Sequence, residues 1–453
     1  MIRARACIVP ALALLLAACG GGGGGGSGAA PPPMQANRPP AITSPAAAAV
    51  DDDSAGSVYQ VTAVDPDGNM LTFSVTGGAD EGAVRITAGG ALSFAEPANF
   101  EAPADSDRDN VYHIRVAVSD GITSTTLDLV LTVRDVPVPT EAAPAWTFLG
   151  NAPWAPRDSA GEAVLNGQLY IMGGWYDSFQ PTLRDVWSSG NGTAWTQVTP
   201  QAPWTHSDWP MSVAFNGRLW MMGGYDLGRL PGSAPTNQVW SSADGANWTL
   251  EAVAPWSARL AGEVVVLNNR LYLLGGLERA IDGTAADLRN DVWVSDDGRT
   301  WTELRRSAEW PARAYHNALA FNGRIWLFGG GNYAPGFEPR NDVWSSADGI
   351  AWRRETARAE WPPRIFAGAV VYRGRMWLLG GYSRTSPQDP NTGFSYGDIW
   401  TSTDGARWTR IISPVVWSPR DAMSAWVLND RIYIGGSFVG GVLSSEVWSL
   451  QMP

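Results

Sequence analysis

The sequence is short of cysteine, histidine and basic residues, and each shortage excludes a class of chemistry. Among 453 residues there are two cysteines, Cys7 and Cys19, so the chain beyond them can form no intrachain disulfide. Three histidines, His113, His206 and His316, argue against a metal centre built from histidine. The 32 Lys and Arg residues face 44 Asp and Glu residues, and the net charge of −12 disfavours a nucleic-acid partner.

Long hydrophobic runs are also missing, apart from one at the amino end. Arg3 and Arg5 precede an apolar run at residues 7–18, which is too short to remain as a spanning helix. The Leu-Ala-Ala-Cys of residues 16–19 resembles a bacterial lipobox and implies a lipoprotein signal peptide over residues 1–19, with Cys19 lipidated. Gly20, in place of an acidic residue, implies sorting to the outer membrane. The Gly- and Pro-rich residues 20–37 are expected to be a flexible linker.

The chain is rich in one repeated block. Six times, an apolar run ends in a Gly pair and is followed by Val-Trp or Ile-Trp, with a period of roughly 50 residues, the length of one four-stranded propeller blade. The Gly pairs begin at Gly173, Gly223, Gly275, Gly329, Gly380 and Gly435. Asn-Gly and Asp-Gly dipeptides stand where tight hairpins between the strands require them. The pattern predicts an all-β fold with a six-bladed β-propeller over residues 146–453.

Tryptophan supports this prediction. All 24 Trp residues lie at or after Trp146, many in three registers of the repeat, as expected for side chains that fill the wedges between blades. The last repeat ends at Trp448 without its fourth strand, and residues 146–148 carry the Trp-Thr signature of that strand. We therefore expect them to complete the last blade and to close the ring, which leaves no open sheet edge.

The repeat resembles the six-bladed kelch propellers over about 300 residues, through the Gly pairs, the repeated Trp and an Arg before each first strand. That Arg stands at Arg157, Arg259, Arg313, Arg364 and Arg420, and the second repeat has Ser207 instead. Kelch propellers serve as adhesion and scaffold modules, oxidases and sugar epimerases, so the resemblance implies the fold more than the function. The copper radical cofactor of galactose oxidase, a relative with this fold, needs a Cys that is missing here.

In kelch relatives the residues just after this Arg reach the central cavity. The resemblance therefore implies a ligand site for a sugar or an acidic peptide. Its expected residues are Arg157, Asp158, Trp209, Arg259, Arg313, Tyr315, His316, Arg364, Phe366, Arg420 and Asp421. An alternative for the arginines is that each ties its own blade together by bonding loop carbonyls.

Residues 38–137 contain no Trp and alternate polar with apolar residues, which predicts an immunoglobulin-like antiparallel β-sandwich. A linker is expected at residues 138–145. The segment resembles bacterial cadherin-type domains through Asp65-Pro66-Asp67-Gly68, Asn99-Phe100-Glu101, residues 105–110, Ser119-Asp120-Gly121 and Val133-Arg134-Asp135.

The same segment is expected to bind Ca²⁺. Carboxylates at alternate positions can converge on one ion, which predicts ligands at Asp105, Asp107 and Asp109 and, in a second loop, at Asp65 and Asp67. The cadherin resemblance adds Glu101 and Asp135. The alternative is that these are solvated turn residues.

Together these features predict a lipid-anchored envelope protein, a binding or adhesion module rather than an enzyme, with a Ca²⁺-binding spacer and a propeller for a glycan or protein. The alternative is a periplasmic carbohydrate enzyme. A kelch sialic acid mutarotase would need a carboxylate facing an Arg or His, for which Glu162, Glu263 and His316 are available. A sialidase-like hydrolase is suggested by residues 295–301, which resemble an Asp-box turn that is one residue short.

Overall fold

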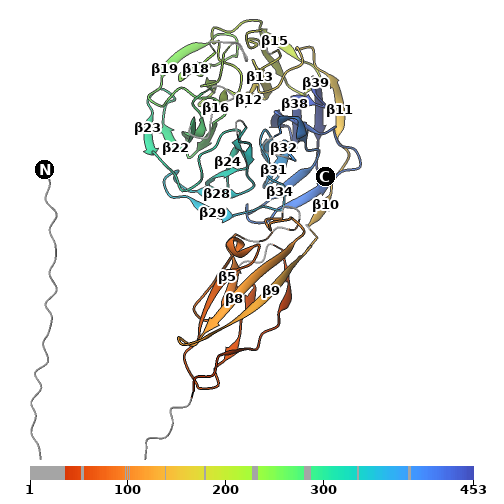
Figure 1. Cartoon of the computed structure of the whole chain (residues 1–453). Coiled ribbons are helices and arrows are strands. Elements are labelled where there is room, and N and C mark those ends of the chain that lie inside the picture. The colour runs from red at the N-terminus through yellow and green to blue at the C-terminus, as the bar shows by residue number, and fades with distance from the viewer. Residues whose placement is uncertain are drawn as a thin grey trace, which may run out of the picture.

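The computed structural model describes residues 36–52, 56–96, 98, 100, 103–137, 139–177, 180–226, 233–279, 287–333, 336–385 and 389–453. Figure 1 shows a slender β-sandwich joined to a disc-shaped propeller. The predicted fold class, a sandwich followed by a six-bladed propeller, is confirmed. Within the described ranges, no helix has the length and apolar composition that crossing a membrane requires.

Two sheets enclose the core of the sandwich. One has the order β2 (Ala47–Asp51), β9 (Ser124–Arg134), β8 (Val111–Ser119) and β5 (Thr72–Gly77). The other has the order β3 (Tyr59–Gln60), β7 (Ala91–Phe94) and β6 (Val84–Ile86), and β1 (Ala41–Ile42) pairs with β4 (Ala63–Val64). Alternate residues of β8, from Tyr112 to Val118, are buried in this core, as the period of a strand requires.

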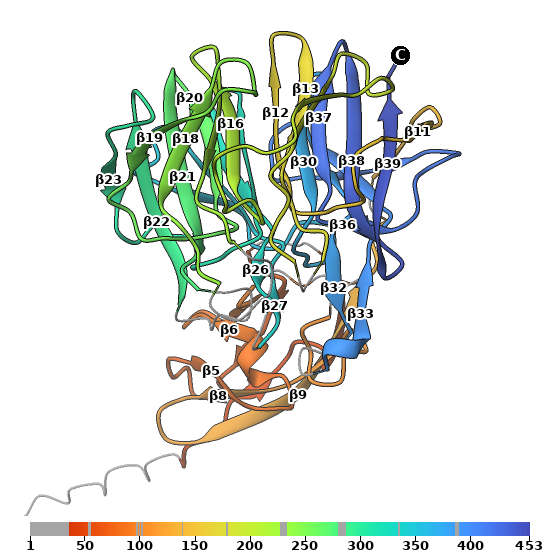
Figure 2. The ribbon, with the colours of Figure 1, turned by 90° about the horizontal axis from the view of Figure 1, so that it is seen from above.

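The propeller consists of six four-stranded blades around one axis. Figure 1 shows it along this axis, and Figure 2 shows it from the side. Blade 1 consists of β12 (Gly161–Leu165), β13 (Gln168–Met172), β14 (Val186–Ser189) and β15 (Thr196–Thr199). Blade 2 consists of β16 (Met211–Phe215), β17 (Arg218–Met222), β18 (Gln238–Ser242) and β19 (Thr249–Val253). Blade 3 consists of β20 (Glu263–Leu267), β21 (Arg270–Leu277), β22 (Leu288–Ser295) and β23 (Thr302–Arg305). Blade 4 consists of β24 (Asn317–Phe321), β25 (Arg324–Phe328), β28 (Val343–Ser346) and β29 (Arg353–Thr356). Blade 5 consists of β30 (Gly368–Tyr372), β31 (Arg375–Leu379), β34 (Ile399–Ser402) and β35 (Thr409–Ile412). Blade 6 consists of β37 (Ser424–Leu428), β38 (Arg431–Val439), β39 (Val442–Leu450) and β11 (Thr147–Asn151).

The ring closes through β11, which comes from the amino side of the propeller and pairs antiparallel with β39 in blade 6. Phe148 lies opposite Trp448, with ring centroids 5.0 Å apart. A further strand, β10 (Thr140–Ala142), pairs in parallel with β35 at the outer edge of blade 5. The segment expected to be a linker at residues 138–145 thus contributes a strand to the propeller.

The third and fourth strands of blades 2 to 5 are joined by one recurrent turn, Ser-x-Asp-Gly-x-x-Trp. In blade 3 the Ser295 hydroxyl accepts the N–H of Gly298 at 2.8 Å, and Trp301 donates its indole N–H to the Gly298 carbonyl at 3.1 Å. Gly298 packs on Trp220 of blade 2, where an added Cβ would lie 2.2 Å from the indole. The turn that resembles an Asp-box is therefore an element of packing between blades.

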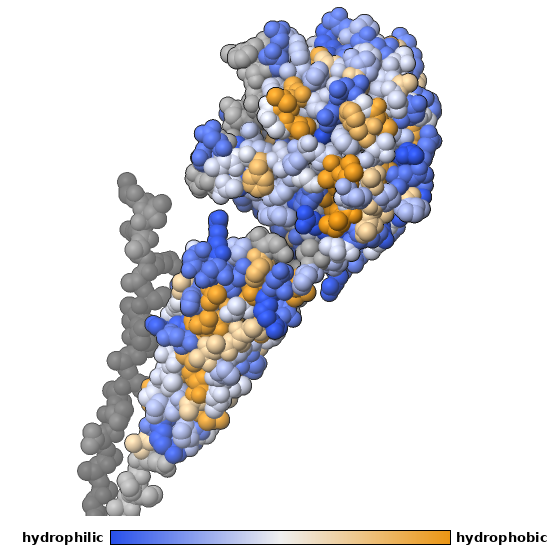
Figure 3. All heavy atoms as spheres, turned by 90° about the vertical axis from the view of Figure 1, so that its right-hand side faces the viewer, coloured by the Kyte–Doolittle hydropathy of each residue, from blue (hydrophilic) through white to orange (hydrophobic). Residues whose placement is uncertain are grey.

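Apolar residues also occur on the surface, but in small groups. Figure 3 shows them on the sandwich and on the outer part of the propeller, with hydrophilic residues between them. The most exposed large ones are Met70 and Ile122 in the sandwich. No single broad apolar docking face is visible among the described residues on this side.

Candidate functional site at the propeller axis

Four of the five recurrent arginines form buried ion pairs inside their own blades. Arg157 donates to both carboxylate oxygens of Asp185, at 2.6 and 2.8 Å, and to the Gly173 carbonyl at 2.8 Å. The same pattern joins Arg259 to Asp291, Arg313 to Asp342 and Arg364 to Asp398.

In blade 6, Arg420 pairs with Glu446 at 2.6 Å. All five arginines are at most 1% exposed. The five arginines therefore stabilise their own blades, which was the alternative interpretation of the sequence. They are not counted among the residues of the ligand site.

Blade 2 lacks both members of this pair. Ser207 replaces the arginine and donates to the Leu183 carbonyl, while Gln238 replaces the aspartate and accepts from the Trp240 indole at 3.0 Å. A buried carboxylate without its arginine would carry an uncompensated charge. The joint replacement by neutral residues keeps blade 2 free of such a charge.

A closed ring of backbone hydrogen bonds surrounds the axis, and we call it the axial ring. Each of its six residues donates its N–H to the carbonyl of the equivalent residue in the preceding blade, at 2.8 to 3.4 Å. Its members are Ser159, Trp209, Ala261, Tyr315, Phe366 and Ala422. All six have left-handed φ angles between 51 and 61°, which are costly for residues other than glycine. The ring of bonds offsets that cost and fixes which side chains reach the axis.

Three large side chains of the axial ring meet at its centre and form the aromatic plug. Trp209 contacts Phe366 with ring centroids 4.8 Å apart, and Tyr315 contacts Phe366 at 4.7 Å and Trp209 at 5.2 Å. The plug separates two cavities, one on each side of the axial ring. Residues of the plug line both of them.

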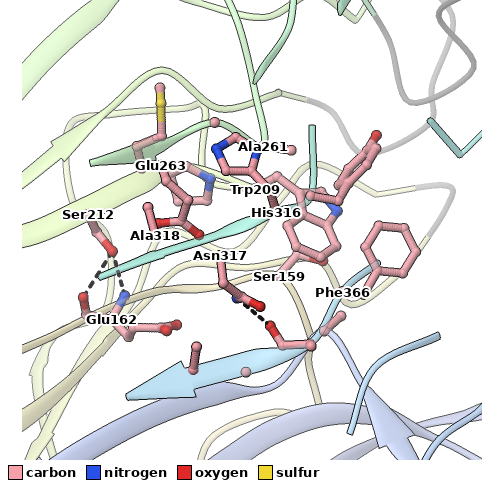
Figure 4. A pocket seen from close by; sticks show the side chains of 18 of the residues that line it. Ser159, Glu162, Trp209, Ser212, Ala261, Glu263, His316, Asn317, Ala318 and Phe366 are labelled. Atoms are coloured by element: carbon pink, nitrogen blue, oxygen red, sulfur yellow. Dashed lines mark hydrogen bonds between the residues drawn. The ribbon is translucent and has the colours of Figure 1, made fainter. Parts of the chain in front are cut away.

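The axial cavity, of about 120 Å³, lies on the inner side of the plug between the first strands of the blades (Figure 4). Glu162 of β12 and Glu263 of β20 both line it, together with His316 and Asn317 at the start of blade 4. The Ser212 hydroxyl accepts the Glu162 N–H at 2.7 Å and donates to its carbonyl at 2.9 Å, which ties blades 1 and 2 together here.

Burial changes the charge of these groups. It raises the pKa of Glu162 to about 7, although the Ser424 hydroxyl and the Ala425 N–H bond the carboxylate. Burial, and then the negative charge of Glu162, raise the pKa of Glu263 well above its usual range. Burial, and then the Arg313 guanidinium, lower the pKa of His316 to about 3, so its imidazole is neutral.

The loop-face pocket, of about 160 Å³, lies on the other side of the plug. Its described lining combines carboxylates with aromatic side chains: Asp158, Asp208 and Asp421 with Trp175, Trp209, Tyr333, Phe366, Tyr382 and Phe438. Asp421 is 4% exposed and accepts from the Ser395 hydroxyl at 2.6 Å. Burial raises the pKa of Asp421 to about 7.

The structure thus brings six of the expected ligand residues to the axis. Asp158, Trp209, Phe366 and Asp421 line the loop-face pocket, while Tyr315 and His316 line the axial cavity. The expected set omitted Trp175 and Tyr382, although each directly follows a Gly pair, a signal that could have identified them.

The acidic residues of the sandwich occupy separate places. Carboxylate oxygens of Asp105, Asp107 and Asp109 lie within 4.8 Å of one another, the only such group of three or more among the residues that the structure describes. Asp105 accepts the N–H groups of Asp109 and Asn110, and the side-chain oxygen of Asn110 is buried without a hydrogen-bond partner. This loop can present several oxygens to one hard cation.

The other expected Ca²⁺ ligands do not all join this group. Asp67 pairs with Arg38 at 2.8 Å, and the Asp65 carboxylate accepts the N–H groups of Asp67 and Asn69. Asn69 connects through Asn37 to Asp120, so this loop lies at the opposite end of β8 from Asp109. The pKa of Asp52 is raised, mainly by burial and also by the negative charge of the nearby Asp135. Glu101, and Cys19 with its signal peptide, lie outside the described residues.

Comparisons with known proteins agree with the geometry of the blades. The family described as the KLHDC2/KLHL20/DRC7 Kelch-repeats domain matches residues 262–453. A solved structure titled "Structure of YjhT" superposes with a TM-score of 0.54 at 17% identity and covers 66% of this chain and 96% of that one. The propeller is therefore of the kelch type.

Curated relatives share only short segments. The flagellar outer arm dynein alpha chain of Chlamydomonas reinhardtii is 32% identical over 160 residues, which are 33% of this chain and 3% of the dynein chain. The leucine-zipper-like transcriptional regulator 1 homolog of Drosophila melanogaster is 26% identical over 168 residues, which are 34% of this chain and 16% of that protein. This chain thus spans a small part of the relatives that it matches.

Proposed function

We propose that this protein is a lipid-anchored recognition module of the bacterial cell envelope, whose propeller binds a glycan in the loop-face pocket. The observation that carries the proposal is the combination of aromatic faces with carboxylates at one end of the axis. Sugar rings pack their C–H faces on aromatic side chains, and their hydroxyl groups donate to carboxylates. Asp158 and Asp421 line the pocket together with Trp209 and Phe366.

The positions of the arginines support a glycan over an acidic peptide, the two ligand classes that the sequence left open. All five are bound to carboxylates within their blades, and the described lining of the loop-face pocket contains no Lys or Arg. The charged groups of this lining are carboxylates, which disfavour an acidic peptide, and the nearby Arg384 stacks on the rings of Tyr333 and Tyr382. A neutral glycan is compatible with the same surface.

A glycan array probed with the full chain tests this proposal. We expect binding to a restricted set of glycans that Trp209→Ala and Asp421→Asn abolish. Asp296→Asn is the matched control, because Asp296 is an exposed carboxylate on an outer turn of blade 3. Absence of binding to every glycan, or binding that both pocket variants retain, would overturn the proposal.

The sandwich is proposed to be a Ca²⁺-binding spacer between the lipid anchor at Cys19 and the propeller. The cluster of Asp105, Asp107 and Asp109 supports this role, and the cadherin resemblance adds Glu101 and Asp135 as ligands. In a calorimetric titration with Ca²⁺, we expect heat that Asp107→Asn removes and that the exposed control Asp128→Asn retains. No heat at millimolar Ca²⁺ would contradict the spacer's metal site.

A carbohydrate enzyme is the second candidate function. It is favoured by the shared axial cavity of Glu162, Glu263 and His316, where carboxyl groups with raised pKa can donate protons near neutral pH. A mutarotase-type site requires an Arg or His, and among the described residues that line this cavity His316 is the one that meets this requirement. Sialic acid mutarotation and sialidase assays test it, with turnover expected to fall at least 10²-fold in Glu162→Gln. Inactivity of the purified chain in both would leave recognition alone.

A further inference from the structure

The inner strands of the propeller form a channel with three layers. The aromatic plug closes one end, and the axial cavity with Glu162 and Glu263 lies beneath it. The next layer is an apolar collar, to which each blade contributes one residue. In each blade this residue stands two positions before the turn that joins the first two strands. Its members are Val164, Ala214, Val266, Ala320, Val371 and Val427. All six are half-buried although they lie on innermost strands, so their small side chains leave space along the axis.

The axial cavity has an uncompensated acidic character. Among the described residues of its lining there are two carboxyl groups and no Lys or Arg. Carboxylates in such a place either stay protonated or pair with a cation, because an isolated charge away from bulk water is expensive. The lining therefore favours a positively charged occupant over a neutral or anionic one.

His316 independently indicates a ligand in the same cavity. The residue is 2% exposed, and neither ring nitrogen makes a hydrogen bond of normal geometry, although the imidazole interacts with the Leu274 backbone. Buried polar groups are rarely left in this state. A neutral imidazole nitrogen can accept a hydrogen bond from an N–H group that enters the cavity.

We propose that the axial cavity binds a small organic cation, a protonated amine with an apolar body, held between the carboxylates of Glu162 and Glu263. The carboxylate and imidazole atoms here do not converge within 4.8 Å as those of Asp105, Asp107 and Asp109 do, so a polyatomic cation fits better than one metal ion. The aromatic plug supplies ring faces for the ammonium group, and the apolar residues that line the cavity, such as Met211 and Met423, contact the alkyl part.

This site is distinct from the proposed glycan pocket, because the axial ring and the plug separate the two cavities. Asp421 belongs to the loop-face pocket alone, and Glu162 and Glu263 belong to the axial cavity alone. Failure of one proposal therefore leaves the other testable through its own variants.

Calorimetric titration of the full chain with n-butylammonium, and with 1-butanol as the neutral probe of equal size, tests the proposal. At pH 8 we expect butylammonium to bind and butanol not to bind. Below pH 7 binding should release protons, seen as a dependence of the heat on the ionisation enthalpy of the buffer. Glu162→Gln and Glu263→Gln should each weaken binding at least 10-fold, whereas the exposed control Glu303→Gln should leave it unchanged.

Three results would overturn the proposal. They are no butylammonium heat at millimolar concentration, equal binding of butanol, and binding that both glutamine variants retain. Titrations of the Asp107→Asn variant with Zn²⁺, Mg²⁺ and Ca²⁺ test a metal ion as the alternative occupant. If a metal binds, Glu162→Gln abolishes that binding and no ammonium binds, the occupant is a metal ion and the proposal is wrong. Circular dichroism of each variant confirms that it is folded.

Discussion

The indole of Trp209 stacks on the phenyl ring of Phe366, with centroids 4.8 Å apart and planes inclined by 28°. The two residues come from blades 2 and 5, on opposite sides of the axis, and their contact closes the channel. Both have left-handed backbones that the axial ring of hydrogen bonds stabilises. This contact, together with Tyr315, therefore separates the two cavities at the axis.

Trp209→Ala should lower the free energy of unfolding by about 2 kcal/mol, because a large, partly buried side chain is removed and its contacts with Phe366 and Tyr315 are lost. Urea unfolding measures this change. Trp209→Phe, which keeps an aromatic ring in the plug, should recover at least half of the loss. Equal losses in both variants would contradict a stabilising role for the aromatic contact.

Glu162→Gln should make stability less dependent on pH. The folded-state pKa of about 7 exceeds the unfolded value near 4.5, so the folded wild type holds a proton that the unfolded chain has released between these values. Wild-type stability therefore falls as pH rises from about 4.5 to 7. The variant should match the wild type at pH 4 and exceed it by about 2 kcal/mol at pH 8.

Urea unfolding of both proteins at pH 4, 6 and 8, without added amines, measures this difference. A constant difference at all three pH values would show that the carboxyl group does not titrate between them in the folded state. Glu303→Gln, at an exposed position, serves as the control and should show no such trend.

Arg313→Ser should destabilise the fold by about 3–5 kcal/mol, because it leaves the buried carboxylate of Asp342 without its ion pair. Adding Asp342→Gln reproduces the neutral pair that blade 2 carries naturally at Ser207 and Gln238. The double variant should recover a substantial part of the loss in thermal or urea unfolding. A double variant less stable than Arg313→Ser would contradict the ion-pair explanation.

Gly298→Ala should destabilise the propeller by about 2–4 kcal/mol. Its Cβ would lie 2.2 Å from the Trp220 indole, and its φ of 75° is unfavourable for alanine. Gly217→Ala is the matched control, because Gly217 has a φ of 70° but no atom within 4 Å of an added Cβ. The control should lose about 1 kcal/mol, so equal losses in the two variants would refute the packing argument.

The architecture was predictable because its signals are local and repeated. The Gly pairs and the Trp of the third strand recur once per blade, and the Asp-Gly turn recurs in blades 2 to 5, so their spacing identifies the strand order. The closure by β11 was also predictable, since Trp146 and Thr147 repeat the signature of the strand that is missing after Trp448.

The site was less predictable because its residues are joined across blades. Glu162 and Glu263 lie in different blades, at neighbouring positions of the first strand, and no spacing in the sequence shows that they share one cavity. The recurrence of Arg157 and its equivalents marks a buried ion pair rather than a ligand contact. The paired absence of that Arg and its Asp from blade 2 was visible in the sequence and could have revealed this role.

The sandwich shows the same limit. Alternate spacing places Asp105, Asp107 and Asp109 together correctly. Spacing alone does not show that Asp65 and Asp67 lie at the far end of β8, because that depends on how the strands are paired. Two loops with equal patterns thus differ in what they can bind.

The most direct test of recognition at the axis is the glycan array with the full chain, the Asp421→Asn variant and the Asp296→Asn control. The account predicts binding to a restricted set of glycans, equal for the wild type and the control and lost in Asp421→Asn. Glycan binding that survives Asp421→Asn unchanged would contradict it.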